Sequence, residues 1–150
     1  MTIVLQILGA CIGSFSACLV FEAPRTSWTI NALLGGIGWA IYLYLANSFS
    51  VAAATYMASL IVAIWSHLNA RWFKAPVTVF FIPAFFPFVP GAGMYRTVYA
   101  FINSTVYAGL QELIQTLAIA IMIALAIFTS DAMFKVLNQY FPIKLSKSKS

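Results

Sequence analysis

Five long apolar stretches, separated by short polar breaks, occupy most of this chain and constrain its fold more than any other feature. They run from about residue 3 to 21, 28 to 45, 50 to 66, 77 to 106 and 113 to 128. A helix of roughly 20 apolar residues is long enough to cross a bilayer. Only 7% of the side chains are charged, too few to coat a soluble globule. The sequence therefore predicts an all-α integral membrane protein with about five transmembrane helices.

The same composition excludes several classes of function. Five spans leave only short loops, so we expect no soluble catalytic or nucleic-acid-binding domain. One histidine and three acidic residues supply no acid–base or metal-ligand cluster, and we expect no enzymatic activity, no metal and no other cofactor. The net charge of +5 does not indicate nucleic-acid binding, because the basic residues sit at the ends of apolar stretches. There they mark topology.

The basic residues predict an orientation in the membrane. Arg25 follows the first stretch, Arg71 and Lys74 follow the third, and four lysines follow the fifth. Five crossings place all three groups on one side, with the N-terminus outside and the C-terminus in the cytoplasm. We expect a transmembrane domain over residues 1–134 and a basic cytoplasmic tail over 135–150. Residues 77–106 then form one interrupted crossing; a re-entrant hairpin is the second interpretation.

The fourth stretch contains the residues that break a helix. Pro83, Pro87 and Pro90 each remove a backbone donor, and Gly91 and Gly93 follow directly. Unwound backbone in a membrane survives only inside protein or beside water, so this break is expected to line a cavity. Transporters aim the N-termini of such half-helices at anionic groups of their substrates.

Arg96 lies just after the break, inside an apolar stretch, together with the amides of Gly93, Met94 and Tyr95. A guanidinium in a membrane span usually faces a pathway or a partner, and its planar fork matches a carboxylate. Three alternatives remain open for Arg96: binding a substrate carboxylate, pairing with Glu112, or reaching to the membrane surface. Glu112 itself is either a proton-coupling group or an acidic residue at a helix N-terminus.

Two other ionisable residues receive no functional role at this stage. His67 lies in the basic loop, at a helix end where the helix dipole favours a cation. Asp131 is interpreted as an ordinary surface residue.

The proline-rich segment resembles a known family. The pattern Pro83-x-x-x-Pro87-x-Val89-Pro90-Gly91, followed by Tyr95-Arg96, resembles the signature of the threonine/serine exporter superfamily. The segments at residues 21–25, 34–39 and 71–80 add to this resemblance. It is nearer to the small subunit of the split, two-protein branch, whose studied members are linked to succinate export.

This resemblance implies a secondary transporter in the inner (cytoplasmic) membrane, of which the chain forms one half. The expected partners are a larger membrane subunit of the same family, a small carboxylate substrate and the lipid bilayer. The substrate would be a succinate-like dicarboxylate, or threonine or serine, bound at the interrupted fourth helix by Arg96, Gly91, Gly93, Met94 and Tyr95. The alternative is a structural membrane subunit that scaffolds a larger partner without transporting anything itself.

Overall fold

The computed structural model describes residues 2–140, apart from the side chain at position 138, and every regular element in this range is a helix. The elements are α1 (Thr2–Val20), η1 (Arg25–Ser27), α2 (Trp28–Leu45), α3 (Val51–Phe73), α4 (Thr78–Phe85), η2 (Phe86–Phe88), α5 (Gly91–Asn103) and α6 (Val106–Tyr140). Five segments of the described chain are long and apolar enough to cross a membrane: Thr2–Val20, Arg25–Leu45, Val51–Phe73, Thr78–Asn103 and Val106–Leu137. The predicted all-α membrane fold with five spans is confirmed.

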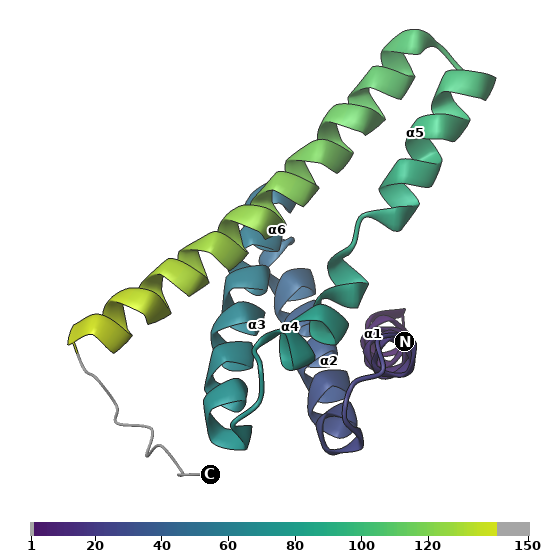
Figure 1. Ribbon diagram of the computed structural model, residues 1–150. Helices are drawn as coiled ribbons and strands as arrows, with labels where there is room; N and C mark the ends of the chain where they lie inside the picture. The colour runs from purple at the N-terminus through teal and green to yellow at the C-terminus, as the bar shows by residue number, and fades with distance from the viewer. Residues whose placement is uncertain (1, 141–150) are drawn as a thin grey trace, which may run out of the picture.

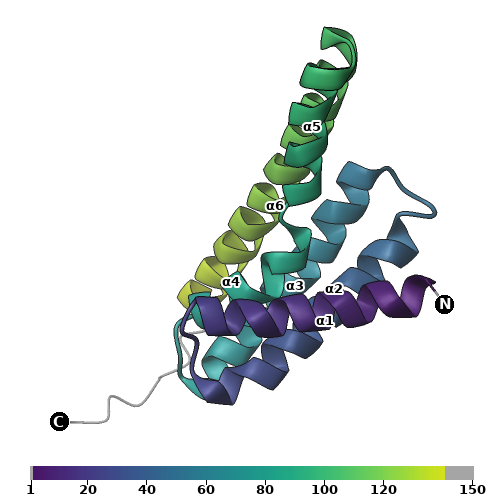
Figure 2. The same cartoon turned by 90° about the vertical axis from the view of Figure 1, so that its right-hand side faces the viewer.

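The helices form a body and a projecting hairpin. Helices α1 to α4 pack together, while α5 and α6 run antiparallel and extend past the other helices (Figure 1; Figure 2). Helix α5 packs mainly against α6, whereas α6 packs against both α5 and α3. Helix α6 therefore links the hairpin to the body.

The core of the body lies where α2, α3 and α4 meet. Leu34, Val62, Ala84, Phe85 and Phe88 are buried there in one cluster. Glycines on α2 allow close helix approach: a methyl group added at Gly35 would collide with Ser14, and one at Gly36 with Cys11. The α1–α2 contact is thus made largely by small residues, as is common between helices in membranes.

The fourth span is broken where the prolines predict it. Helix α4 ends at Phe85, a short 3₁₀ turn follows, and α5 begins at Gly91. Helix α4 lies within the body, and α5 runs on from it toward the α5–α6 connection (Figure 1; Figure 2). Thr78–Asn103 together are long and apolar enough for one crossing, as the interpretation of one interrupted span requires.

The protein itself satisfies the carbonyl groups that the prolines release. Proline lacks the amide that would bond the carbonyl four residues earlier. The carbonyl freed by Pro83 belongs to Val79, and Asn31 Nδ2 donates to it at 2.9 Å. The amide of Phe86 donates to the Pro83 carbonyl, and the amide of Val89 donates to the Phe86 carbonyl at 3.3 Å. These bonds explain how the break is tolerated at membrane depth.

The last span is longer than the hydropathy pattern predicts. Helix α5 ends at Asn103, and α6 begins at Val106 rather than near residue 113, with Thr105 Oγ1 accepting from the amide of Ala108 at 3.2 Å as an N-cap. The polar residues at 111, 112 and 115 interrupt an apolar pattern without interrupting a helix, because glutamine and glutamate are good helix formers. At the other end α6 continues to Tyr140, so the predicted domain boundary after residue 134 falls within a helix. Residues 141–150 of the predicted tail lie outside the described residues.

The basic residues gather at one end of the molecule. The α1–α2 connection, the α3–α4 connection and the end of α6 lie at that end, while the α2–α3 and α5–α6 connections lie at the other (Figure 1; Figure 2). Arg25, Arg71, Lys74 and Lys135 belong to the first end by their positions in the chain. Arg96 lies apart from them, in the middle of α5.

Candidate functional site

Arg96 and Glu112 form an ion pair across the α5–α6 hairpin. The closest approach joins Arg96 Nε to Glu112 Oε2 at 3.4 Å, and the two side chains are 62% and 34% exposed. Charge-assisted hydrogen bonds of this type are usually about 2.7–2.9 Å long. The structure therefore brings together the two ionisable residues singled out around the break, in a loose contact that is open to its surroundings.

An open groove of about 680 Å³ runs along the same face of the hairpin. Its lining includes Ser104, Gln111, Glu112 and Gln115, together with Ala100, Ala108, Ile114 and Ala118. Residues four apart on a helix share a face, so Arg96 and the lining residue Ala100 lie on the same face of α5. Glu112 belongs both to this lining and to the ion pair with Arg96, so the groove contains one member of the pair together with hydroxyl and amide groups.

Small residues and threonines fix the register of α5 on α6. Gly93 is buried against α6, and a Cβ added there would lie 2.6 Å from Thr116 Oγ1. The hydroxyl of Thr97 donates to the Gly93 carbonyl at 2.9 Å, which satisfies it inside the interface. This contact lies one helical turn before Arg96 on α5 and one turn after Glu112 on α6, so it holds the two charged residues level with each other.

The backbone amides at the start of α5 are partly engaged within the helix. The amide of Gly91 donates to the Val89 carbonyl at 2.7 Å, and that of Met94 donates to the Pro90 carbonyl at 3.0 Å. Tyr95 lies beyond the first turn, where an amide bonds to the residue four positions earlier. The amides of Ala92 and Gly93, in the first turn of α5, are therefore the ones best suited to bind an anion. The sequence predicted this role for the amides of Gly93, Met94 and Tyr95.

Glu112 does not lie at the beginning of its helix. Helix α6 starts at Val106, which places Glu112 in the second turn, and the helix dipole acts mainly within the first turn. Its partner is the side chain of Arg96 rather than the helix terminus.

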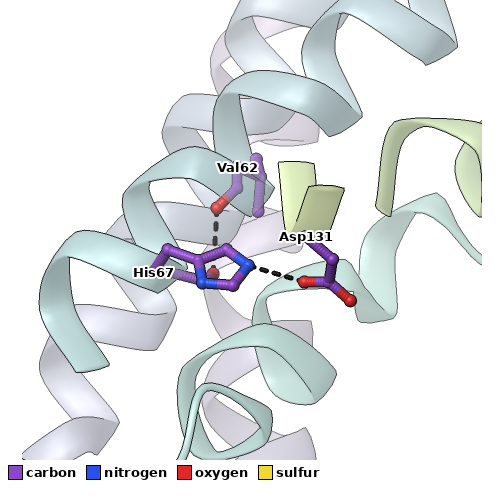
Figure 3. Close-up of polar contacts among 4 residues, drawn as sticks. Val62, His67 and Asp131 are labelled. Carbon is purple, nitrogen blue, oxygen red and sulfur yellow. Dashed lines mark hydrogen bonds and ion pairs between the residues drawn. The ribbon is translucent and has the colours of Figure 1, made fainter. Parts of the chain in front are cut away.

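The structure also pairs the two ionisable residues to which the sequence gave no role. His67 Nε2 on α3 lies 2.7 Å from Asp131 Oδ1 on α6 (Figure 3). His67 is part of helix α3, not of a loop, and its side chain is only 15% exposed. The sequence did contain a signal for this pair. Both residues are ionisable groups within spans, and such groups by default indicate a function.

Five apolar helices, with a broken fourth span and ionisable pairs between helices, define a multi-pass membrane protein. Comparison with protein families agrees, since the family described as "Threonine/Serine exporter, ThrE" matches residues 6–133. The chain belongs to the threonine/serine exporter family, as its proline-rich segment indicated. No solved structure matches the chain at a significant level.

Proposed function

We propose that this chain is one subunit of a secondary transporter that exports small carboxylates or amino acids, with the substrate carboxylate bound by Arg96. Candidate substrates are threonine and serine, or a succinate-like dicarboxylate. The observation that carries the proposal is the position of Arg96: it lies within a membrane span, beside a polar groove, and is more than half exposed.

A guanidinium inside a membrane span is energetically unfavourable. Placing arginine at the centre of a span costs about 2.5–3.5 kcal/mol on insertion scales. A purely structural ion pair recovers most in close, bidentate geometry, and the 3.4 Å approach to Glu112 is not close. A substrate carboxylate can therefore take the place of Glu112 on Arg96 at little cost.

Glu112 is the proposed coupling residue of this site. When Glu112 is ionised it competes with the substrate for Arg96, and when it is protonated this competition ends. For a zwitterionic substrate, the ionised carboxylate also offers a counter-charge to an ammonium group. The amides of Gln111 and Gln115 and the hydroxyl of Ser104 line the same groove and are suited to a hydroxyl-bearing or second polar group.

The break supplies the hinge of the proposed transporter. Pro87 and Pro90 separate α4, which is packed in the body, from α5, which is packed on α6. The turn from Gly91 to Tyr95 lies between the break and Arg96 and belongs to the proposed binding element. Movement of the α5–α6 hairpin relative to the body would change which side of the membrane reaches the groove.

The finer assignment is that the chain is the small subunit of the split branch of the family, acting with a larger membrane subunit in the inner membrane. The projecting hairpin supports a partner, because α5 contacts few helices other than α6 while carrying exposed polar groups. The expected orientation keeps the N-terminus outside and the C-terminus in the cytoplasm.

Replacing Arg96 with glutamine tests the proposed site. We expect Arg96→Gln to reduce export of threonine, serine and succinate to the background of a deletion strain, while the protein still inserts and assembles. The measurement is efflux of each labelled solute from loaded cells at matched protein levels. Arg25→Gln is the matched control, because Arg25 is an exposed arginine at the end of a span, stacked 5.9 Å from the Trp28 ring, and should export normally.

Normal efflux in Arg96→Gln would contradict the binding role. Efflux that falls only in proportion to lost partner protein would favour the alternative, a subunit that scaffolds without binding substrate. The observed Arg96–Glu112 pair is the feature that such a structural subunit would also use.

A further inference from the structure

We propose that His67 and Asp131 form a proton-binding site between α3 and α6. The charge state of this site determines the orientation of the α5–α6 hairpin relative to the body. This site is separate from the Arg96–Glu112 pair. Its consequence for transport rests on the proposed function, but the experiment below does not use transport.

The side chains that contact His67 suit an ionisable ring. The imidazole lies 2.7 Å from the Asp131 carboxylate and stacks on Phe134 with ring centroids 4.4 Å apart and an interplanar angle of 16°. Both partners belong to α6, one helical turn apart, so a single residue of α3 contacts α6 at two points. In the close-up, the His67 and Asp131 side chains point toward each other from the two helices (Figure 3).

Adding a proton to His67 changes the nature of this contact. With a neutral ring only the Asp131 carboxylate is charged, whereas with an imidazolium two opposite charges face each other, which strengthens the contact. An imidazolium is also attracted to the face of the Phe134 ring. Histidine is the side chain that ordinarily changes charge in the physiological range.

The neighbouring charges offer Asp131 another partner when the proton leaves. Lys135 follows Asp131 by one turn of α6, and residues at this spacing meet on a helix surface. On α3, the guanidinium of Arg71 lies 4.8 Å from the centre of the Phe134 ring. Helices α2 and α4, which also pack on α3, carry no acidic or basic side chain; their titratable groups are Tyr42 and Tyr44. Asp131, 62% exposed, can therefore exchange His67 for Lys135.

Helix α6 transmits such a change. It packs on α3 near Asp131 and on α5 near Thr116, and Glu112 lies about 28 Å from Asp131 along the helix axis. A change in the angle at which α6 crosses α3 therefore moves the hairpin that carries the groove. Protonation at one end of α6 thereby controls the position of the candidate substrate site near the other.

The experiment compares the charge of His67 with the position of the hairpin in the full chain, reconstituted in lipid nanodiscs. Because the sequence contains one histidine, ¹⁵N-histidine labelling gives a single imidazole whose charge is read by nuclear magnetic resonance. Spin labels at Asn47→Cys and Val106→Cys, with Cys11 and Cys18 replaced by alanine, report the distance between the body and the hairpin tip. We expect this distance to change with pH, following the imidazole signal.

Three variants decide whether His67 causes the change. His67→Gln and Asp131→Asn should abolish the pH-dependent change in distance. Tyr56→Phe is the matched control, because it removes a different α3–α6 hydrogen bond, from Tyr56 to Thr129 at 3.2 Å, without removing a group that titrates in the physiological range; it should retain the change. A distance that does not vary with pH, or that still varies in both His67→Gln and Asp131→Asn, would overturn the proposal. A transport defect in Arg96→Gln has no bearing on this outcome, so the two proposals fail separately.

Discussion

Asn31 shows how one side chain makes a broken helix possible inside a membrane protein. It is fully buried and donates from Nδ2 to the Val79 carbonyl at 2.9 Å and to Cys18 Sγ at 3.3 Å. The Val79 carbonyl is the one that Pro83 leaves without its helical partner. A polar residue on α2 thus replaces a backbone bond that a proline on α4 removes, and it joins α1, α2 and α4 at that point.

This account predicts a specific coupling between Asn31 and Pro83. Asn31→Leu should destabilise the protein by about 1–2 kcal/mol, because a buried carbonyl loses its donor. In a Pro83→Ala background the restored amide can bond the Val79 carbonyl, so the same substitution should cost less. Unfolding in mixed micelles, followed for the two single variants and the double variant, measures this difference. Equal costs in both backgrounds would show that Asn31 does not act through the Val79 carbonyl.

At the scale of the element, the α5–α6 hairpin depends on close approach at one glycine. Gly93 faces Thr116 with no room for a side chain, whereas Gly91, two residues earlier, has nothing within 4 Å of an added Cβ. Neither glycine has a positive φ, so their difference is one of packing rather than backbone strain. The contact at Gly93 aligns Arg96 with Glu112.

The two glycines therefore make a matched pair for mutation. Gly93→Ala should push α5 from α6 and lower stability by about 1–3 kcal/mol, as overpacking of a close contact does. Gly91→Ala should leave stability nearly unchanged. Thermal unfolding of both variants in detergent, with labelling of an Ala100→Cys reporter to follow opening of the hairpin, is the measurement. Equal behaviour of the two variants would contradict the close contact at Gly93.

At the scale of the whole molecule, the basic residues are concentrated at one end. The connections that carry Arg25 and the Arg71–Lys74 segment lie at the same end as Lys135, and the α2–α3 and α5–α6 connections lie at the other (Figure 1). Basic residues in short loops stay mostly on the cytoplasmic side of a membrane. The fold thereby offers one orientation that satisfies this rule, with Arg96 as the exception, held by Glu112.

Accessibility of single cysteines tests this orientation. With Cys11 and Cys18 replaced, Asn47→Cys in the α2–α3 connection should react with a membrane-impermeant maleimide in intact cells. Thr26→Cys in the α1–α2 connection should react only after the membrane is permeabilised, because it lies beside Arg25 on the proposed cytoplasmic side. The reverse pattern would place the N-terminus in the cytoplasm and exclude the proposed topology.

The chain's composition, hydropathy and proline spacing determined the class of fold, the position of the break and the family. These properties are local: an apolar run of sufficient length has to cross the bilayer as a helix, and a proline removes a backbone bond wherever it stands. The boundary between α5 and α6 was less well determined, because polar residues such as Glu112 disturb hydropathy without ending a helix.

Only the tertiary structure decided which polar groups meet. The pairs Arg96–Glu112, His67–Asp131 and Asn31–Val79 each join two different helices, and a sequence pattern does not indicate how two helices cross. For Arg96 the sequence left three alternatives open, and for His67 it indicated no partner. The physical reason is that burial in lipid requires each polar group to find a partner, while the packing of small residues between helices determines which partner lies within reach.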